Sequence, residues 1–189
     1  GWTRIVELAL HPRVVAIGET GLDYDRVFSP IPDQLVNLRR NLALALETGK
    51  PAILHVRSAV GRSDAQEAIL AELNAAPAQG VIHSFSGSVD YARRVLDLGL
   101  AISISGLAFR NGEEATAEVV PLVPPDRLLV ETDSPFLSPP GAPRGRNEPA
   151  FVGITGAWVG ERRAAATSEW ADDHLVGAYD RLFRSRPVA

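Results

Sequence analysis

The amino-acid sequence predicts an α/β fold in which helices cover a parallel sheet. Five short apolar runs alternate with stretches whose apolar residues recur at helical spacing. Such alternation favours parallel strands joined by right-handed crossovers. Several of the runs end in an acid or a histidine, and the carboxyl ends of parallel strands are where α/β proteins place their active sites.

The composition limits the classes of protein and of metal site. The chain has 189 residues, of which 46% are hydrophobic and 22% charged, so we expect residues 1–189 to form one globular domain. It has no cysteine, so any bound metal takes histidine and carboxylate ligands. The net charge of −4 argues against broad electrostatic binding of nucleic acid, although bound cations supply positive charge locally.

The expected location is the cytoplasm, without contact to a membrane. No apolar run approaches the roughly 20 residues that span a bilayer. The N-terminus also lacks the pattern of a signal peptide.

Five apolar runs are predicted to form the strands of the sheet. They are residues 14–17, 51–56, 81–85, 100–104 and 128–132. Residues 18–23, which follow the first run, are interpreted as a loop. Five strands are too few to close an eight-stranded barrel, so the sequence leaves two architectures: an open sheet, or a barrel whose earlier strands precede Gly1.

Helical periodicity and terminal signals place helices between and after these strands. Asp33 is the predicted N-cap of the first long helix, and Gly49 ends it. The spacing of Ser63 and Gln66 predicts a capping box in front of another helix. The buried face of the long helix is expected to contain Leu35, Leu38, Leu42, Ala45 and Leu46. Further helices are expected around 91–98, 114–120, 151–162 and 168–183.

Four of the predicted strands lead into side chains that commonly bind metals. Glu19 follows the apolar residues 14–17, His55 follows 52–54, His83 follows 81–82, and Asp133 follows the last run. Glu131 and Asp133 are expected on one face of that last strand, where buried acids need a partner or a metal. One strand ending in a histidine is common, whereas four ending in Glu, His, His and Asp suggest a metal site.

Each of these residues also has a simpler interpretation. Glu19 alone suits a loop carboxylate, and a single histidine such as His55 or His83 is more often a core residue. Asp133 alone suits an Asx turn ahead of Pro135. Two histidines at strand ends, with acids on the flanking strands, favour the metal site.

Arg57 and Ser86 are candidate contacts for a phosphate group. Arg57 lies on the second strand, and its guanidinium forms forked hydrogen bonds to phosphates; a pair with Glu131 or another acid is the alternative. Ser86 opens a Ser-Gly-Ser turn whose backbone amides suit an anion at the start of a helix. A simple N-cap formed by Ser88 explains the same turn.

Arg146 and Asn147 lie in a loop rich in proline and glycine that is suited to substrate contact. Arg144 adds to the positive charge of this loop, and a solvated surface loop is the alternative. Glu131 is interpreted either as a side chain that orients a metal ligand or as a member of a structural salt bridge.

Five motifs run through nearly the whole chain. They are AIGETGLDY at 16–24, HVR at 55–57, HSFSG at 83–87, ETDSPFL at 131–137 and RNEP at 146–149. In this order and at this spacing they resemble the TatD family of metal-dependent deoxyribonucleases. The resemblance implies a TIM-type (β/α)₈ barrel that holds divalent metal ions.

The resemblance also implies roles for four residues. Glu19, His55, His83 and Asp133 would be metal ligands, with Glu19 bridging two ions, and Glu19 and Asp133 would be catalytic. The family's other ligands form a His-x-His pair on its first strand, which this chain lacks. The chain therefore resembles an incomplete barrel that covers about the last five strands.

The leading hypothesis is a hydrolase that cleaves DNA phosphodiester bonds with one or two Mg²⁺, Mn²⁺ or Zn²⁺ ions. More narrowly, we expect a 3′–5′ exonuclease that acts on single-stranded DNA or a 3′ end, and a monomer if the barrel is complete. A hydrolase of amide or ester substrates on the same scaffold is an alternative. A truncated, non-catalytic remnant is another, because an opened barrel leaves strand edges unpaired.

Overall fold

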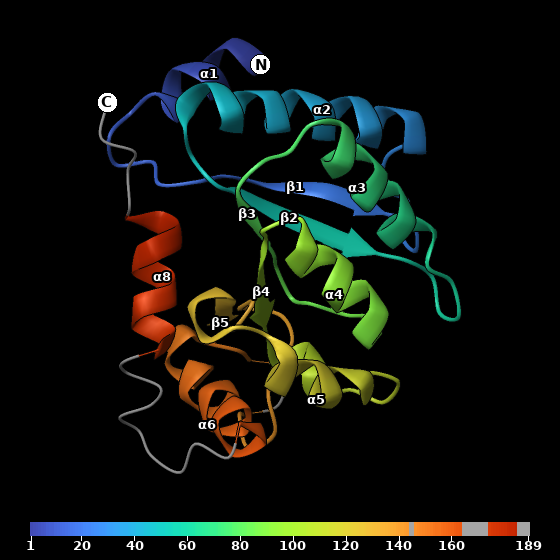
Figure 1. Ribbon diagram of the computed structural model, residues 1–189, viewed down its shortest axis with the longest axis vertical. Coiled ribbons are helices and arrows are strands. Elements are labelled where there is room, and N and C mark those ends of the chain that lie inside the picture. Colours follow the sequence, from blue (N-terminus) through green and yellow to red (C-terminus); the bar gives the residue numbers. More distant parts are fainter. Residues whose placement is uncertain (144–145, 164–173, 185–189) are drawn as a thin grey trace. The chain divides into compact units, whose positions relative to one another are not determined.

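The computed structural model is an α/β protein with a five-stranded sheet, and it describes residues 1–143, 146–163 and 174–184 (Figure 1). The strands follow one another in the order β1-β2-β3-β4-β5. Sequential order is that of a barrel wall, whereas a doubly wound sheet reverses its order at a switch point. The strands are β1 (Ile17–Asp23), β2 (Ala52–Arg57), β3 (Gly80–Ile82), β4 (Ala101–Ile104) and β5 (Leu128–Val130).

The chain divides into two compact units, which are described separately. The first comprises Gly1–Val81 together with the residues from Leu182 onward, and the second comprises Ile82–Arg181. The single domain expected over residues 1–189 stays a prediction.

The first unit packs three helices with two parallel strands. The helices are α1 (Trp2–Ala9), α2 (Ile31–Thr48) and α3 (Asp64–Ala75). Gln34 on α2 accepts a hydrogen bond from the backbone N–H of Asp23 (2.8 Å) and donates one to its carbonyl (3.1 Å), which fixes α2 against the end of β1. Gly49 ends α2 in a left-handed conformation (φ 63°), as the sequence predicts.

The first strand lies later in the sequence than predicted. Residues 18–23 were expected to form a loop, but β1 runs through them and pairs with β2, with Leu22 opposite Val56. A Cβ added at Gly21 would lie 1.9 Å from the carbonyl oxygen of His55. The glycine therefore permits close approach of two strands here, instead of marking a turn.

One predicted helix start is misplaced, and the other is right but lacks the predicted capping box. Pro30 is the N-cap of α2 and Asp33 lies in its first turn, because the proline at position 32 already suits the first turn of a helix. Ser63 precedes α3 without a side-chain capping bond; the hydroxyl of Ser58 instead accepts from the amide of Ala65 (2.9 Å).

The buried face of α2 also differs from the prediction: Leu35 is only half-buried, and Leu46 lies outside this face. Leu38, Leu42 and Ala45 are buried as expected. Leu46 is 69% exposed, and Leu44, at 3%, is buried in its place. The buried face of α2 is therefore rotated slightly about the helix axis relative to the face that the sequence predicted.

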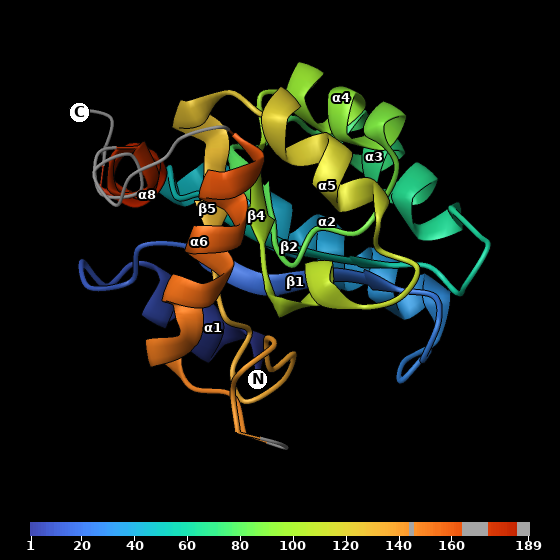
Figure 2. The same cartoon turned by 90° about the horizontal axis from the view of Figure 1, so that it is seen from below.

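The second unit contains β4, β5 and the helices around them. Its longer helices are α4 (Val89–Asp97), α5 (Ala115–Val119), α6 (Val152–Arg162) and α8 (Val176–Phe183). Figures 1 and 2 both show α4 beside α5. The 3₁₀ turns are η1 (Gly106–Phe109), η2 (Val120–Leu122), η3 (Pro125–Arg127) and η4 (Pro149–Phe151).

The helices of the second unit agree with the sequence where they are described. The hydroxyl of Ser88 accepts a hydrogen bond from the amide of Tyr91 (3.1 Å) and so caps α4. The expected helix 168–183 is described only from residue 174, and α8 accounts for its last part. None of the described helices combines the length and hydropathy of a membrane span.

Candidate metal centre

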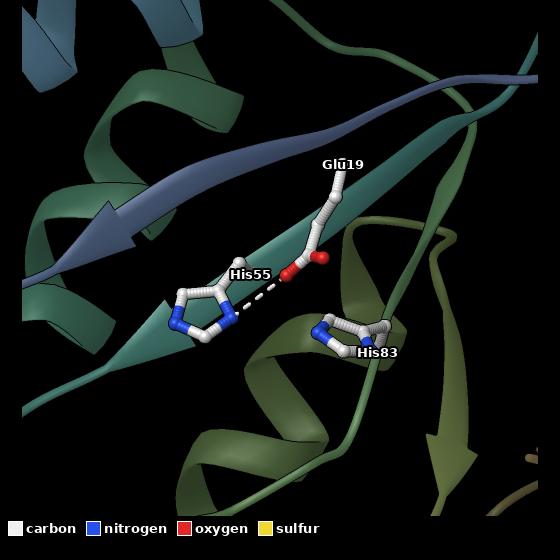
Figure 3. A group of neighbouring side chains, drawn as sticks. All are labelled: Glu19, His55 and His83. Atoms are coloured by element: carbon white, nitrogen blue, oxygen red, sulfur yellow. Dashed lines mark ion pairs between the residues drawn. The ribbon is translucent and has the colours of Figure 1, made fainter. Parts of the chain in front are cut away.

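Glu19 and His55 face one another from adjacent strands of the first unit. The Nδ1 atom of His55 lies 2.9 Å from Oε1 of Glu19 (Figure 3). The other ring nitrogen, Nε2, lies 3.6 Å from Oδ2 of Asp23. The parallel pairing of β1 with β2 sets this geometry, because it places Gly21 opposite His55. The pair is partly exposed, so a carboxylate and an imidazole are both accessible to an ion.

His83 follows β3 in the second unit and contacts Glu131. Its Nδ1 atom lies 2.9 Å from Oε1 of Glu131. The strand predicted over 81–85 ends at Ile82, and Ser84 has a left-handed backbone (φ 44°). His83 is therefore held in a turn just past the strand, as metal ligands at strand ends commonly are.

Glu131 receives several hydrogen bonds besides the contact with His83. Oε1 accepts from the backbone amide and the hydroxyl of Ser84, both at 2.8 Å. Oε2 accepts from the hydroxyl of Ser103 at 2.6 Å. Burial raises the pKa of Glu131, but the hydrogen bonds and charge of His83 and the bonds from both serines outweigh it and hold that pKa below its usual value.

Asp133 lies in a turn beyond β5. The predicted strand 128–132 ends at Val130, and Asp133 has a φ of 53°, so the strand alternation from Leu129 does not extend to it. Its carbonyl oxygen accepts from the amide of Phe136 (2.8 Å). The turn thus places Asp133 by backbone geometry and not by strand periodicity.

Asn147 holds both sides of this turn. Its Nδ2 donates to the carbonyl oxygens of Thr132 (2.7 Å) and Phe136. The side chain is 4% exposed. Arg146 beside it is exposed and pairs with Glu148, whereas Arg144 lies outside the described residues.

The two candidate phosphate contacts each have a protein partner. Arg57 forms an ion pair with Asp25, whose Oδ2 lies 2.8 Å from Nε and 2.7 Å from Nη2. The sequence left Glu131 or another acid as the partner of Arg57, and the structure shows that the partner is Asp25. The hydroxyl of Ser86 donates to Oε1 of Glu113 (2.9 Å). Contact of Arg57, Ser86, Arg146 and Asn147 with a substrate stays a prediction.

Sequence reasoning missed the serines around Glu131. Ser103 and Ser105 are buried, and they alternate with isoleucines in an apolar run. A buried hydroxyl needs a hydrogen-bond partner. This alternation therefore indicates that a polar group packs against the serine face of β4. The partner itself, 28 residues away from Ser103, was not visible in the sequence.

The structure is that of an α/β protein with a parallel sheet, and it contains two acid–histidine contacts, Glu19 with His55 and Glu131 with His83. The chain belongs to the family described as TatD related DNase, whose model it matches over residues 2–184. The family expected from the motifs is thereby confirmed.

Three similar proteins illustrate this membership. An uncharacterized metal-dependent hydrolase, YabD of Bacillus subtilis, is 39% identical over 181 residues, covering 95% of this chain and 69% of its own. The 3′-5′ ssDNA/RNA exonuclease TatD of a Rahnella species is 43% identical over 155 residues, covering 78% and 57%. The crystal structure of the TatD homologue YJJV of Escherichia coli has a TM-score of 0.81 at 29% identity, covering 98% and 71%.

The structural match confirms the predicted fold class. The chain spans between 57% and 71% of the lengths of these three proteins. The strands of this chain therefore correspond to a part of each of them.

Proposed function

We propose that this chain carries the metal site of a hydrolase that cleaves phosphodiester bonds of DNA. The observation that carries the proposal is the 2.9 Å contact between Glu19 and His55, which lie within the adjacent parallel strands β1 and β2. A carboxylate and an imidazole placed together in this way suit a divalent metal. Membership of the TatD-related family supports the same reaction class.

The proposed ligands are Glu19 and His55, which contact one another in the first unit (Figure 3), together with His83. Their donor atoms are carboxylate oxygen and imidazole nitrogen without thiolate, which suits Mg²⁺, Mn²⁺ or Zn²⁺. We propose Asp133 as a further ligand, since it follows the last strand of the same sheet. This set would accommodate one or two ions.

A bound divalent ion lowers the pKa of a water molecule and polarises the phosphoryl oxygen. In the proposed reaction, Asp133 would accept the proton of the attacking water, and Glu19 would act as a catalytic metal ligand. Arg57 and Arg146 are proposed to bind phosphate groups. Arg57 pairs with Asp25, and Arg146 pairs with Glu148. A phosphate therefore has to displace these carboxylates or bind the guanidinium groups beside them.

We propose single-stranded DNA with a free 3′ end as the substrate. The support is the name of the Rahnella relative, a 3′-5′ ssDNA/RNA exonuclease. Fold alone does not choose between nucleic acids and other esters or amides.

The test uses a 5′-labelled single-stranded oligonucleotide with Mn²⁺ or Mg²⁺, with and without EDTA. We expect metal-dependent shortening from the 3′ end. Glu19→Gln should reduce it by more than about 100-fold, which exceeds the usual effect of substitutions outside the ligand shell. Glu47→Gln, an exposed acid on α2, is the matched control and should keep wild-type activity.

Two outcomes would overturn the proposal. One is cleavage that persists in EDTA or in Glu19→Gln. The other is metal-dependent hydrolysis of amide or carboxylic-ester substrates with no cleavage of the oligonucleotide, which would support a different hydrolase on this scaffold.

A further inference from the structure

We propose that Glu131 is a positioning residue that keeps the hydrogen of the His83 ring on Nδ1, so that Nε2 carries the lone pair a metal ion requires. The metal-binding part of this inference rests on the proposed function. The tautomer itself does not, because every contact involved lies within the second unit.

The direction of the hydrogen bond follows from the other donors around Glu131. The backbone N–H of Ser84 points to Oε1 at 2.8 Å and can only donate. The hydroxyl of Ser103 donates to Oε2 at 2.6 Å. Both oxygens of Glu131 therefore act as acceptors, so the hydrogen in the 2.9 Å contact with His83 belongs to Nδ1 of the ring.

The carboxylate is in turn held by Ser103 on β4 and by a hydrogen bond between Ser84 and Ser105, which follows β4. The hydroxyls of Ser84 and Ser105 lie 2.9 Å apart, and Ser105 also accepts from the amide of Leu107 (3.1 Å). Ser103 and Ser105 are buried. A buried polar network whose members are satisfied holds one geometry, and here it connects the turn after β3 with the ends of β4 and β5.

A carboxylate that accepts from a ring N–H orients the ring and strengthens the opposite nitrogen as a ligand.

A purely structural salt bridge is the competing role for Glu131. It would stabilise the second unit without any consequence for the position of the ring hydrogen. The tautomer of His83 therefore separates the two roles, whereas thermal stability alone does not.

The first test is the tautomer of His83 in the metal-free chain, measured from ring ¹⁵N chemical shifts at neutral pH. The chain has four histidines, and His83→Gln identifies the signals of this one. We expect the Nδ1–H tautomer in the wild-type chain. The Nε2–H tautomer would overturn the proposal without any variant of Glu131.

Variants of Glu131 provide the second test. Glu131→Ala removes the acceptor, so we expect the Nε2–H tautomer to appear. Glu131→Gln keeps an oxygen beside the amide of Ser84 and should retain Nδ1–H. Glu118→Gln, an exposed acid on α5, is the control. An unchanged tautomer in a folded Glu131→Ala variant would overturn the proposal.

Zinc titration then connects the tautomer to ligand strength. Glu131→Ala should weaken Zn²⁺ binding by about 10–100-fold, with a smaller loss in Glu131→Gln. Equal affinity in all variants would overturn the positioning role. A wild-type chain that shows the Nδ1–H tautomer but binds no Zn²⁺ would contradict the proposed function. The tautomers of the Glu131 variants would still test whether Glu131 positions the His83 ring.

Discussion

Arg39 and Glu72 illustrate how a single ion pair joins two helices of the first unit. Nε and Nη2 of Arg39 donate to the two carboxylate oxygens of Glu72 at 2.7 Å and 2.6 Å. The hydrogen bond from Arg39 is the main cause that lowers the pKa of Glu72, and burial only partly opposes it. The pair therefore links α2 to α3 in a pH-dependent way.

We predict that Arg39→Ala lowers the melting temperature slightly at neutral pH and has no effect in acid. The folded-state pKa of Glu72 is depressed, so its stabilisation is complete above the unfolded value of about 4.3 and is lost as the pH falls through the folded pKa. Thermal melts from pH 7 to pH 3 measure this. Arg13→Ala, at an exposed arginine of the same unit, should show no such pH dependence.

Which acid pairs with which arginine could not be predicted from the residues alone. The sequence suggested Glu131 or another acid as a partner for Arg57, and only the structure shows that the partner is Asp25. The reason is the register of two strands: β1 and β2 place Asp23 opposite Arg57, and Asp25 follows in the turn. The candidate ligands were easier to predict, because their residue types are restricted by metal chemistry.

At the scale of elements, most strands and helices could be predicted, and the errors lie at their ends. β2 and β4 agree with the predicted runs to within one residue at each end. β1 was misplaced because its two glycines suggest a loop, although the strand uses Gly21 for close contact with β2. Tertiary pairing, which a local pattern does not contain, decides such cases.

We predict that Gly21→Ala destabilises the chain by about 1–3 kcal/mol or more, because the new methyl group meets the carbonyl of His55 at 1.9 Å. The two strands must separate, which also disturbs the contact between Glu19 and His55. Urea unfolding measures the loss. Gly153→Ala, in α6 with open space around the new Cβ, should not destabilise, and equal losses in both variants would contradict this account.

The loop after β5 depends on Asn147, and we predict that Asn147→Ala lowers the free energy of unfolding by about 1–3 kcal/mol. The substitution removes the donor for the carbonyls of Thr132 and Phe136. Urea unfolding compared with Asn74→Ala, whose amide bonds only the carbonyl of Leu70 on an exposed helix face, is the measurement. An Asn147→Ala variant as stable as Asn74→Ala would argue against the role of Asn147.

At the scale of the whole molecule, the fold class and the family follow from features spread along the entire sequence. Strand and helix patterns alternate along the chain, and five motifs follow one another in a fixed order. These features do not change when the predicted end of one strand or helix is wrong. The division into two compact units was not predicted, because it depends on contacts between residues distant in sequence. The same limit applies to the hydrogen bonds around Glu131.

The central claim is the proposal that Glu19, His55 and His83 bind a divalent metal. The most direct test is the metal content of the purified chain after loading with Zn²⁺ or Mn²⁺, together with its melting temperature before and after EDTA. We expect one or two ions per chain and a melt that chelation lowers, since ligand at 100 times its dissociation constant stabilises by about 2.7 kcal/mol. A cooperative melt without bound metal, unchanged by EDTA, would contradict the claim.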